Sequence, residues 1–93
     1  MPAYVICHVE RHDTGRAATT RALLTRRIAE LWNGTLQFDA TWIVEAEKTS
    51  DQIRDELTPC LGDGDALLVI GAASDAAWAG FEPAECDWLV EHL

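Results

Sequence analysis

Two near-continuous apolar segments, one near the start of the sequence and one about two thirds of the way along it, constrain the fold most. The first is Tyr4–Cys7, inside an expected strand over residues 3–9, and the second is an expected strand over residues 66–70. β-branched and aliphatic residues favour strands, and apolarity without alternation indicates a strand that is covered on both faces. The chain therefore needs a sheet with its first and last strands inside, and with something packed on each side of it.

Between these strands the pattern predicts a helix and two further strands. Apolar residues keep helical spacing over residues 16–32, at Ala17, Leu24, Ile28 and Leu31. Asp13 or Thr14 is the candidate cap, and Asn33 with Gly34 is expected to end the helix. A short strand is expected over residues 35–38. Residues 41–47 then alternate, with Trp42, Val44 and Ala46 on one face and Thr41, Ile43, Glu45 and Glu47 on the other.

A second helix and a final helix complete the pattern. Thr49 and Gln52 have the spacing of a capping box, and the helix they open has one apolar stripe at Ile53, Leu57, Cys60 and Leu61. Pro59 predicts an irregular last turn, and residues 62–65 predict a tight turn. Residues 73–80 are expected to form a loop or a short turn of helix around Trp78. Pro83 then begins a short helix that runs to about His92.

The expected order is β-α-β-β-α-β followed by a C-terminal helix. This order predicts a single α+β, ferredoxin-like domain over residues 1–93, with both central helices on one face of an antiparallel sheet. The first and last strands would then expose an apolar face opposite those helices, and such a face is expected to be covered by a partner. We therefore expect a homodimer, formed through sheet faces or sheet edges.

The charge of the chain is acidic and uneven. Seven Lys and Arg residues against sixteen Asp and Glu residues give a formal net charge of −9 over 93 residues. Residues 1–43 carry a net charge of +1 and residues 44–93 a net charge of −10. Proteins that bind nucleic acid are usually basic, so direct nucleic-acid binding is disfavoured. A chain this short also leaves little room for a deep private active site.

The compartment expected from the sequence is the cytoplasm. The first residues lack the basic and long apolar regions of a secretory signal, and no apolar run approaches the length of a membrane span. Three cysteines, Cys7, Cys60 and Cys86, have no CxxC spacing, which favours reduced and partly buried thiols.

An ordered set of segments resembles a known family. The segments are residues 3–7, 41–44, 49–57 and 65–70, Ala77-Trp78, and Cys86-Asp87-Trp88-Leu89. Together they resemble the small SinR-like proteins, which are similar to the CRISPR-associated Cas-two-like family, over nearly the whole chain. The resemblance implies a dimeric ferredoxin-like fold. It also implies a metal-dependent nuclease in which an Asp at the end of the first strand binds a divalent metal across the dimer.

The position that matches this Asp is occupied by Val9, which cannot bind a metal. Glu10 follows it, but strand alternation directs Glu10 to the opposite face unless a bulge intervenes. The chain therefore departs from the family where the chemistry would occur. Glu10 is the only weak catalytic candidate, magnesium or manganese would be required only by this nuclease alternative, and otherwise we expect no cofactor and no metal site.

Other local patterns favour structural roles. His8 and His12 are four residues apart but lie in a strand end and a loop, where they would diverge, and Cys7 and His8 face opposite sides of a strand. Residues 62–65 lack the spaced acids of a calcium loop. The four tryptophans, Trp32, Trp42, Trp78 and Trp88, are expected in the core or at a dimer interface.

Two sets of charged residues are candidate contact surfaces. The acidic set contains Glu45, Glu47, Asp51, Asp55, Glu56, Asp63 and Asp65, and the basic set contains Arg11, Arg16, Arg26 and Arg27. The leading hypothesis is a non-catalytic dimer that acts through protein–protein contacts. Its acids would imitate nucleic-acid phosphate and block the basic groove of a nucleic-acid-binding, defence-type protein. The alternatives are the nuclease with a displaced carboxylate and a small-molecule-responsive regulatory module.

Overall fold

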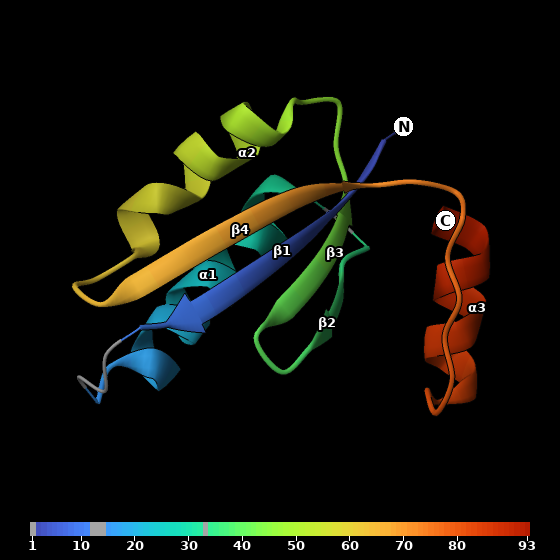
Figure 1. The fold of residues 1–93 in the computed structure, drawn as a ribbon, viewed down its shortest axis with the longest axis horizontal. Helices are drawn as coiled ribbons and strands as arrows, with labels where there is room; N and C mark the ends of the chain where they lie inside the picture. The colour runs from blue at the N-terminus through green and yellow to red at the C-terminus, as the bar shows by residue number, and fades with distance from the viewer. Residues whose placement is uncertain (1, 12–14, 33) are drawn as a thin grey trace.

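The computed structural model describes residues 2–11, 15–32 and 34–93. The elements follow in the order β1 (Ala3–Glu10), α1 (Ala17–Leu31), β2 (Leu36–Phe38), β3 (Thr41–Glu45), α2 (Ser50–Leu57), a short 3-10 turn (Thr58–Cys60), β4 (Asp65–Ala72) and α3 (Pro83–His92). The predicted order β-α-β-β-α-β with a C-terminal helix is therefore present (Figure 1). The architecture is α+β and broadly ferredoxin-like.

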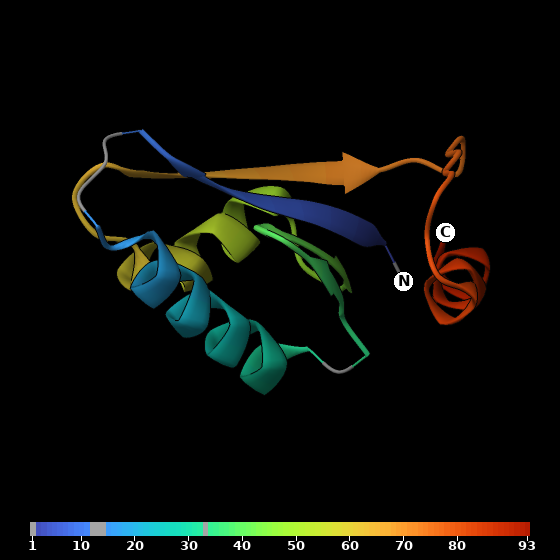
Figure 2. The same ribbon diagram turned by 90° about the horizontal axis from the view of Figure 1, so that it is seen from below.

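The four strands form one open antiparallel sheet in the order β2-β3-β1-β4. β1 lies in the middle, and residues 3–7 pair with β3 while the whole of β1 pairs with β4. β4 is an edge strand, whereas the sequence placed it inside the sheet with β1. The helices α1 and α2 lie together on one face of the sheet (Figure 2), and α3 packs against β2 and β3 on the other face.

The main core lies between the sheet and the helices α1 and α2. Its buried residues come from β1, α1, β3 and α2 and from the residues directly after α1 and β3: Ile6, Leu24, Ile28, Trp32, Trp42, Val44, Ala46, Ile53 and Leu57. Most of these positions belong to the apolar stripes of the two helices and to the alternating segment after Thr41. Burial of these side chains provides the main driving force for the fold.

A second, smaller core lies on the other side of the sheet. Leu89 of α3 is buried against Leu36 and Ile43, with Phe38, Trp78, Phe81 and Trp88 packed around them. The alternation predicted over residues 41–47 is confirmed at residues 42–44, because Ile43 lies in this core whereas Trp42 and Val44 lie in the main core. The C-terminal helix therefore covers one half of the sheet face for which the sequence predicted a partner.

Local signals set several element boundaries. Thr49 and Gln52 form the predicted capping box, with Thr49 Oγ1 accepting from the Gln52 N–H and Gln52 Oε1 accepting from the Thr49 N–H. Pro59 lies in the 3-10 turn that follows α2, as the predicted irregular turn requires. The predicted caps Asp13 and Thr14 and the helix stop at Asn33 lie outside the described residues. A second capping box, between Glu82 and Glu85, opens α3.

Candidate functional site

A buried polar cluster lies where β1, α1 and the start of β4 meet. Asp65 Oδ1 lies 2.8 Å from His8 Nε2, and the two side chains are 2% and 0% exposed. The other carboxylate oxygen, Oδ2, accepts from the Thr20 hydroxyl at 2.7 Å and from the Gly62 N–H at 2.8 Å. One carboxylate thus joins β1, the first turns of α1 and the turn before β4.

The hydrogen bonds keep Asp65 ionised despite its burial. Burial alone would raise the pKa of this carboxyl, because removal from water penalises the charged form. The donors of His8, Thr20 and Gly62, together with the positive character of His8, outweigh that effect and lower the pKa of Asp65 to about 2. An ionised carboxylate only accepts hydrogen bonds, so His8 Nε2 carries a hydrogen and donates it to Asp65.

This arrangement is not that of an activated nucleophile. In a nucleophile–base–acid triad the hydroxyl bonds to the imidazole. Here the Thr20 hydroxyl and the His8 imidazole both donate to Asp65, and among the described residues no hydrogen bond joins the two donors to each other. Among the described residues, His8 Nδ1 and Glu10 Oε2 are buried atoms without a hydrogen-bond partner. The described residues contain no group of three or more His, Cys, Asp or Glu side chains placed to hold a metal ion.

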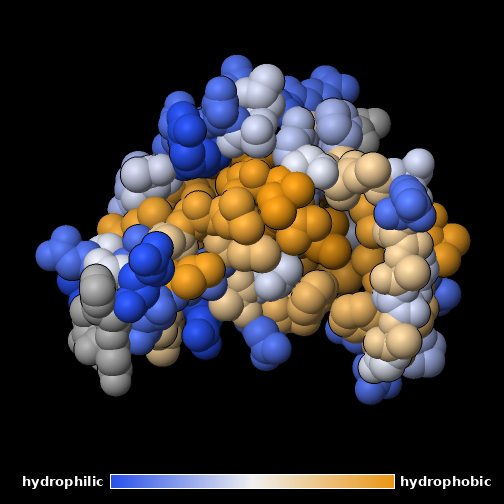
Figure 3. Space-filling view, viewed as in Figure 1, coloured by the Kyte–Doolittle hydropathy of each residue, from blue (hydrophilic) through white to orange (hydrophobic). Residues whose placement is uncertain are grey.

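The second candidate surface is the open half of the sheet, on β1 and β4. Val9, Leu68 and Ile70 are 43%, 50% and 49% exposed and point away from α1 and α2. Cys7 is half buried and lies opposite Leu68 in the β1–β4 register. Figure 3 shows a hydrophobic area over these strands. The polar surface of α2 lies on one side of this area, and α3 lies on another. We call the surface formed by Val9, Leu68 and Ile70 the open face.

Val9, at the position that the resemblance matches to the family's Asp, and its neighbour Glu10 lie on opposite sides of the sheet. Val9 belongs to the open face, whereas Glu10 has the same strand parity as Ile6 and His8 and therefore faces the helices. The pairing of β1 with β4 is continuous through Glu10, and no bulge redirects it. Position 9 is thus accessible to another molecule, while Glu10 has one oxygen buried.

The predicted acidic residues do not form one surface. Asp51 and Asp55 are exposed on α2 and both pair with Arg54. Glu45 pairs with His92, at 3.4 Å, near α3. Glu47 and Asp63 are exposed at other places in the chain. Asp65 must be removed from the predicted contact set, because its side chain is buried and fully engaged.

The predicted basic residues also separate into two groups. Arg11 follows β1 and Arg16 precedes α1, and the Arg16 guanidinium lies against Gly62. Arg26 and Arg27 lie about ten residues further along α1, or ~15 Å at the rise of an α-helix. They pair with Glu30, and Arg27 also pairs with Glu56. His12, which the sequence analysis expected to diverge from His8, lies outside the described residues.

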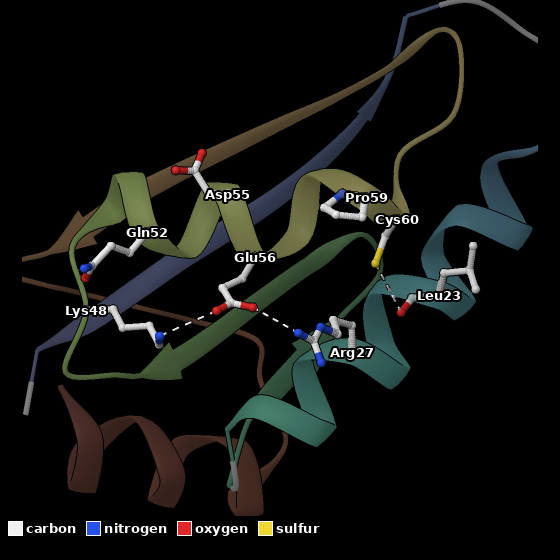
Figure 4. Close-up of a pocket in the computed structure, with 8 residues that line it drawn as sticks. All are labelled: Leu23, Arg27, Lys48, Gln52, Asp55, Glu56, Pro59 and Cys60. Atoms are coloured by element: carbon white, nitrogen blue, oxygen red, sulfur yellow. Dashed lines mark hydrogen bonds and ion pairs between the residues drawn. The ribbon is translucent and has the colours of Figure 1, made fainter.

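A groove of about 760 Å³ lies between α1 and α2. Figure 4 shows Glu56 pointing between Lys48 and Arg27, and the distances are 3.7 Å to Lys48 Nζ and 3.0 Å to Arg27 Nη2. The remaining wall is formed largely by Leu23, Pro59 and Cys60. Burial raises the pKa of the Cys60 thiol, and Glu30 adds to this while Arg27 opposes it. A raised pKa disfavours the thiolate, so Cys60 is a poor nucleophile.

The His8–Asp65–Thr20 cluster was missed by the sequence analysis. Strand alternation does place His8 on the same face as Ile6. However, Asp65 precedes the apolar run and was assigned to the turn, although β4 begins at this residue. Only the β1–β4 register and the position of α1 bring the three side chains together.

The described residues include no helix with both the length and the apolarity that crossing a membrane requires. Comparison with known proteins finds no family model that matches the chain, no curated protein of significantly similar sequence and no solved structure of significantly similar fold.

Proposed function

We propose that this protein acts without catalysis, as a homodimer that binds other proteins, and that β4 carries its self-contact. The supporting observation is the combination of exposed Leu68 and Ile70 with the position of β4 at the edge of the sheet. Exposed apolar side chains that gather on one surface are typical of interaction sites. A long edge strand also presents unpaired N–H and C=O groups to a neighbour.

Sedimentation at several protein concentrations tests the self-contact. We expect the mass of a dimer for the wild type and the mass of a monomer for Leu68→Lys, since the substitution places a charge in the contact. Leu23→Lys is the matched control, because Leu23 is 45% exposed but lies on α1 away from β4. A wild-type protein that stays monomeric at tens of micromolar would contradict the proposal.

The acidic charge suggests the kind of partner that the dimer binds. With a net charge of −9, the dimer would carry about twice that charge, and long-range attraction would favour a basic partner. We propose that it occupies the basic, nucleic-acid-binding groove of another protein. A pull-down from the native host should recover such a protein, with capture weakening as salt is added. Recovery of neutral or acidic partners alone would contradict this part.

The nuclease alternative rests on Val9, which lies exposed at the position matching the family's metal ligand. It is tested with RNA and duplex DNA in the presence of magnesium or manganese. We expect no cleavage by the wild type. Cleavage by Val9→Asp alone would indicate a scaffold that lacks only its ligand, whereas cleavage by the wild type, lost in Glu10→Gln, would support the displaced-carboxylate enzyme.

A further inference from the structure

We infer that two copies of the chain pair edge to edge, β4 against β4 in antiparallel order, and form one continuous eight-stranded sheet. This inference rests on the proposed homodimer and assigns its geometry. The second copy would bind at the outer edge of β4, and the open faces would stay free for a different partner.

The edge of β4 is well suited to accept a strand. The strand is eight residues long and pairs only with β1 in the described sheet. Its residues 66–72 contain no proline and no charged side chain. Lysines, prolines and bulges are the usual features that protect a sheet edge from pairing. Their absence from β4 leaves its main-chain groups available to a neighbour.

A small groove lies beside the middle of this strand. It measures about 200 Å³ and is lined by Leu67, Leu68 and Val69 together with Ser50, Asp51 and Arg54 of α2. α2 packs against β4 on the helix side of the sheet, so an added strand would contact this helix as well as the strand edge. The groove therefore combines an apolar floor with one acidic and one basic side chain.

A two-fold axis would bring the acidic side chain beside the groove of one copy to the basic side chain of the other copy. Asp51 and Arg54 are one turn apart on α2, and Arg54 Nη1 lies 3.8 Å from Asp51 Oδ1 within one chain. A two-fold axis at the middle of β4 would place the two α2 helices antiparallel. Arg54 of each copy would then face Asp51 of the other. This charge complementarity favours a second copy as the occupant over an unrelated segment.

The alternation of side chains along β4 restricts which residues of the two β4 strands can lie opposite each other. Directly opposed residues of antiparallel strands point to the same face. Leu68 points to the open face, whereas Val69 packs against the main core. A two-fold axis between these two residues would set Leu68 opposite Val69 of the other copy, so the axis must instead pass through a residue. An axis at Leu68, in the middle of the groove, sets Leu68 against its own copy and Ala66 against Ile70. The two open faces then form one larger apolar surface.

Charge variants of α2 distinguish this geometry from packing of the open faces. Asp51→Arg should raise the dimer dissociation constant roughly tenfold, because it sets Arg against Arg in two places. The double variant Asp51→Arg/Arg54→Asp restores the complementarity and should restore the dimer. Val9→Lys, on the open face one strand away from the edge, should leave the dimer intact.

The outcomes separate the two proposals. A dimer that Val9→Lys dissolves and the α2 variants do not affect would overturn the edge geometry and leave the proposed homodimer standing. A double variant that dimerises no more tightly than Asp51→Arg would also overturn the edge geometry. A monomeric wild type would overturn both. Circular dichroism of each variant confirms that loss of the dimer is not loss of the fold.

Discussion

His8 Nε2 lies 2.8 Å from Asp65 Oδ1, in a place where neither side chain is more than 2% exposed. The contact joins two residues that are 57 positions apart, on adjacent antiparallel strands. Thr20 adds α1 to the same carboxylate. The cluster therefore fixes three elements relative to one another by directional bonds, which the apolar core cannot supply.

Asp65→Asn should destabilise the fold by about 2 kcal/mol. The substitution keeps the size of the side chain but replaces charge-assisted hydrogen bonds with weaker neutral ones, and it offers only one acceptor oxygen to three donors. Urea denaturation measures the free energy of unfolding. Asp63→Asn is the control, because Asp63 is exposed in the turn just before Asp65. Equal losses for the two variants would contradict the role of the cluster.

The stability of the fold should fall in acid as Asp65 is protonated. Folding lowers the pKa of this carboxyl from 3.8 to about 2, so the folded state favours the ionised form. The resulting stabilisation is fully present above pH 3.8 and is lost as the pH falls toward 2. Comparing the wild type with Asp65→Asn isolates this contribution. Their difference in unfolding free energy should shrink over this interval, and a constant difference would contradict the assignment.

Thr20→Val should cost about 1 kcal/mol, since it removes one of the donors to Asp65 while keeping the volume of the side chain. Thr19→Val, one position earlier on the exposed side of α1, gives the matched comparison. Both substitutions place the same β-branched residue in the helix, so their difference reports the hydroxyl alone. Thermal unfolding followed by circular dichroism gives that difference, and equal melting temperatures would exclude a role for the hydroxyl.

Leu89→Ala should loosen α3 and destabilise the fold by about 2 kcal/mol, because it leaves a cavity in the smaller core. Val90→Ala is the control, since Val90 is 71% exposed on the same helix. Trp88 donates a hydrogen bond to the Gly34 carbonyl and stacks on His92. We therefore expect tryptophan fluorescence to change in Leu89→Ala and to stay the same in Val90→Ala.

The helices and strands themselves were predicted more accurately from the sequence than the order in which the strands lie side by side. Local signals, such as the capping box at Thr49 and the alternation around Ile43, depend on residues close in the chain and were confirmed. The placement of β4 inside the sheet was wrong, because its continuous apolarity has another cause. Leu67 and Val69 face the main core, whereas Leu68 and Ile70 remain exposed on the open face.

The candidate sites were harder to predict for a related reason. Charged residues that lie near one another in the sequence were grouped into surfaces, but Asp65 is buried and Glu56 is held between Arg27 and Lys48. Whether an acid is exposed depends on which cation the fold brings to it. That information lies in contacts between distant segments, which composition and spacing do not contain.

The two cores lie on opposite faces of the sheet, and adjacent residues of β3 belong to different ones. Ile43 packs with Leu89, whereas Val44 packs with the helices on the other side. We therefore expect α3 to detach while the main core stays folded, so that its amide hydrogens exchange with solvent through such partial opening. Amides of β1 that pair with β3 should exchange only when the whole molecule unfolds. The chain would thus show two levels of protection from exchange within a single domain.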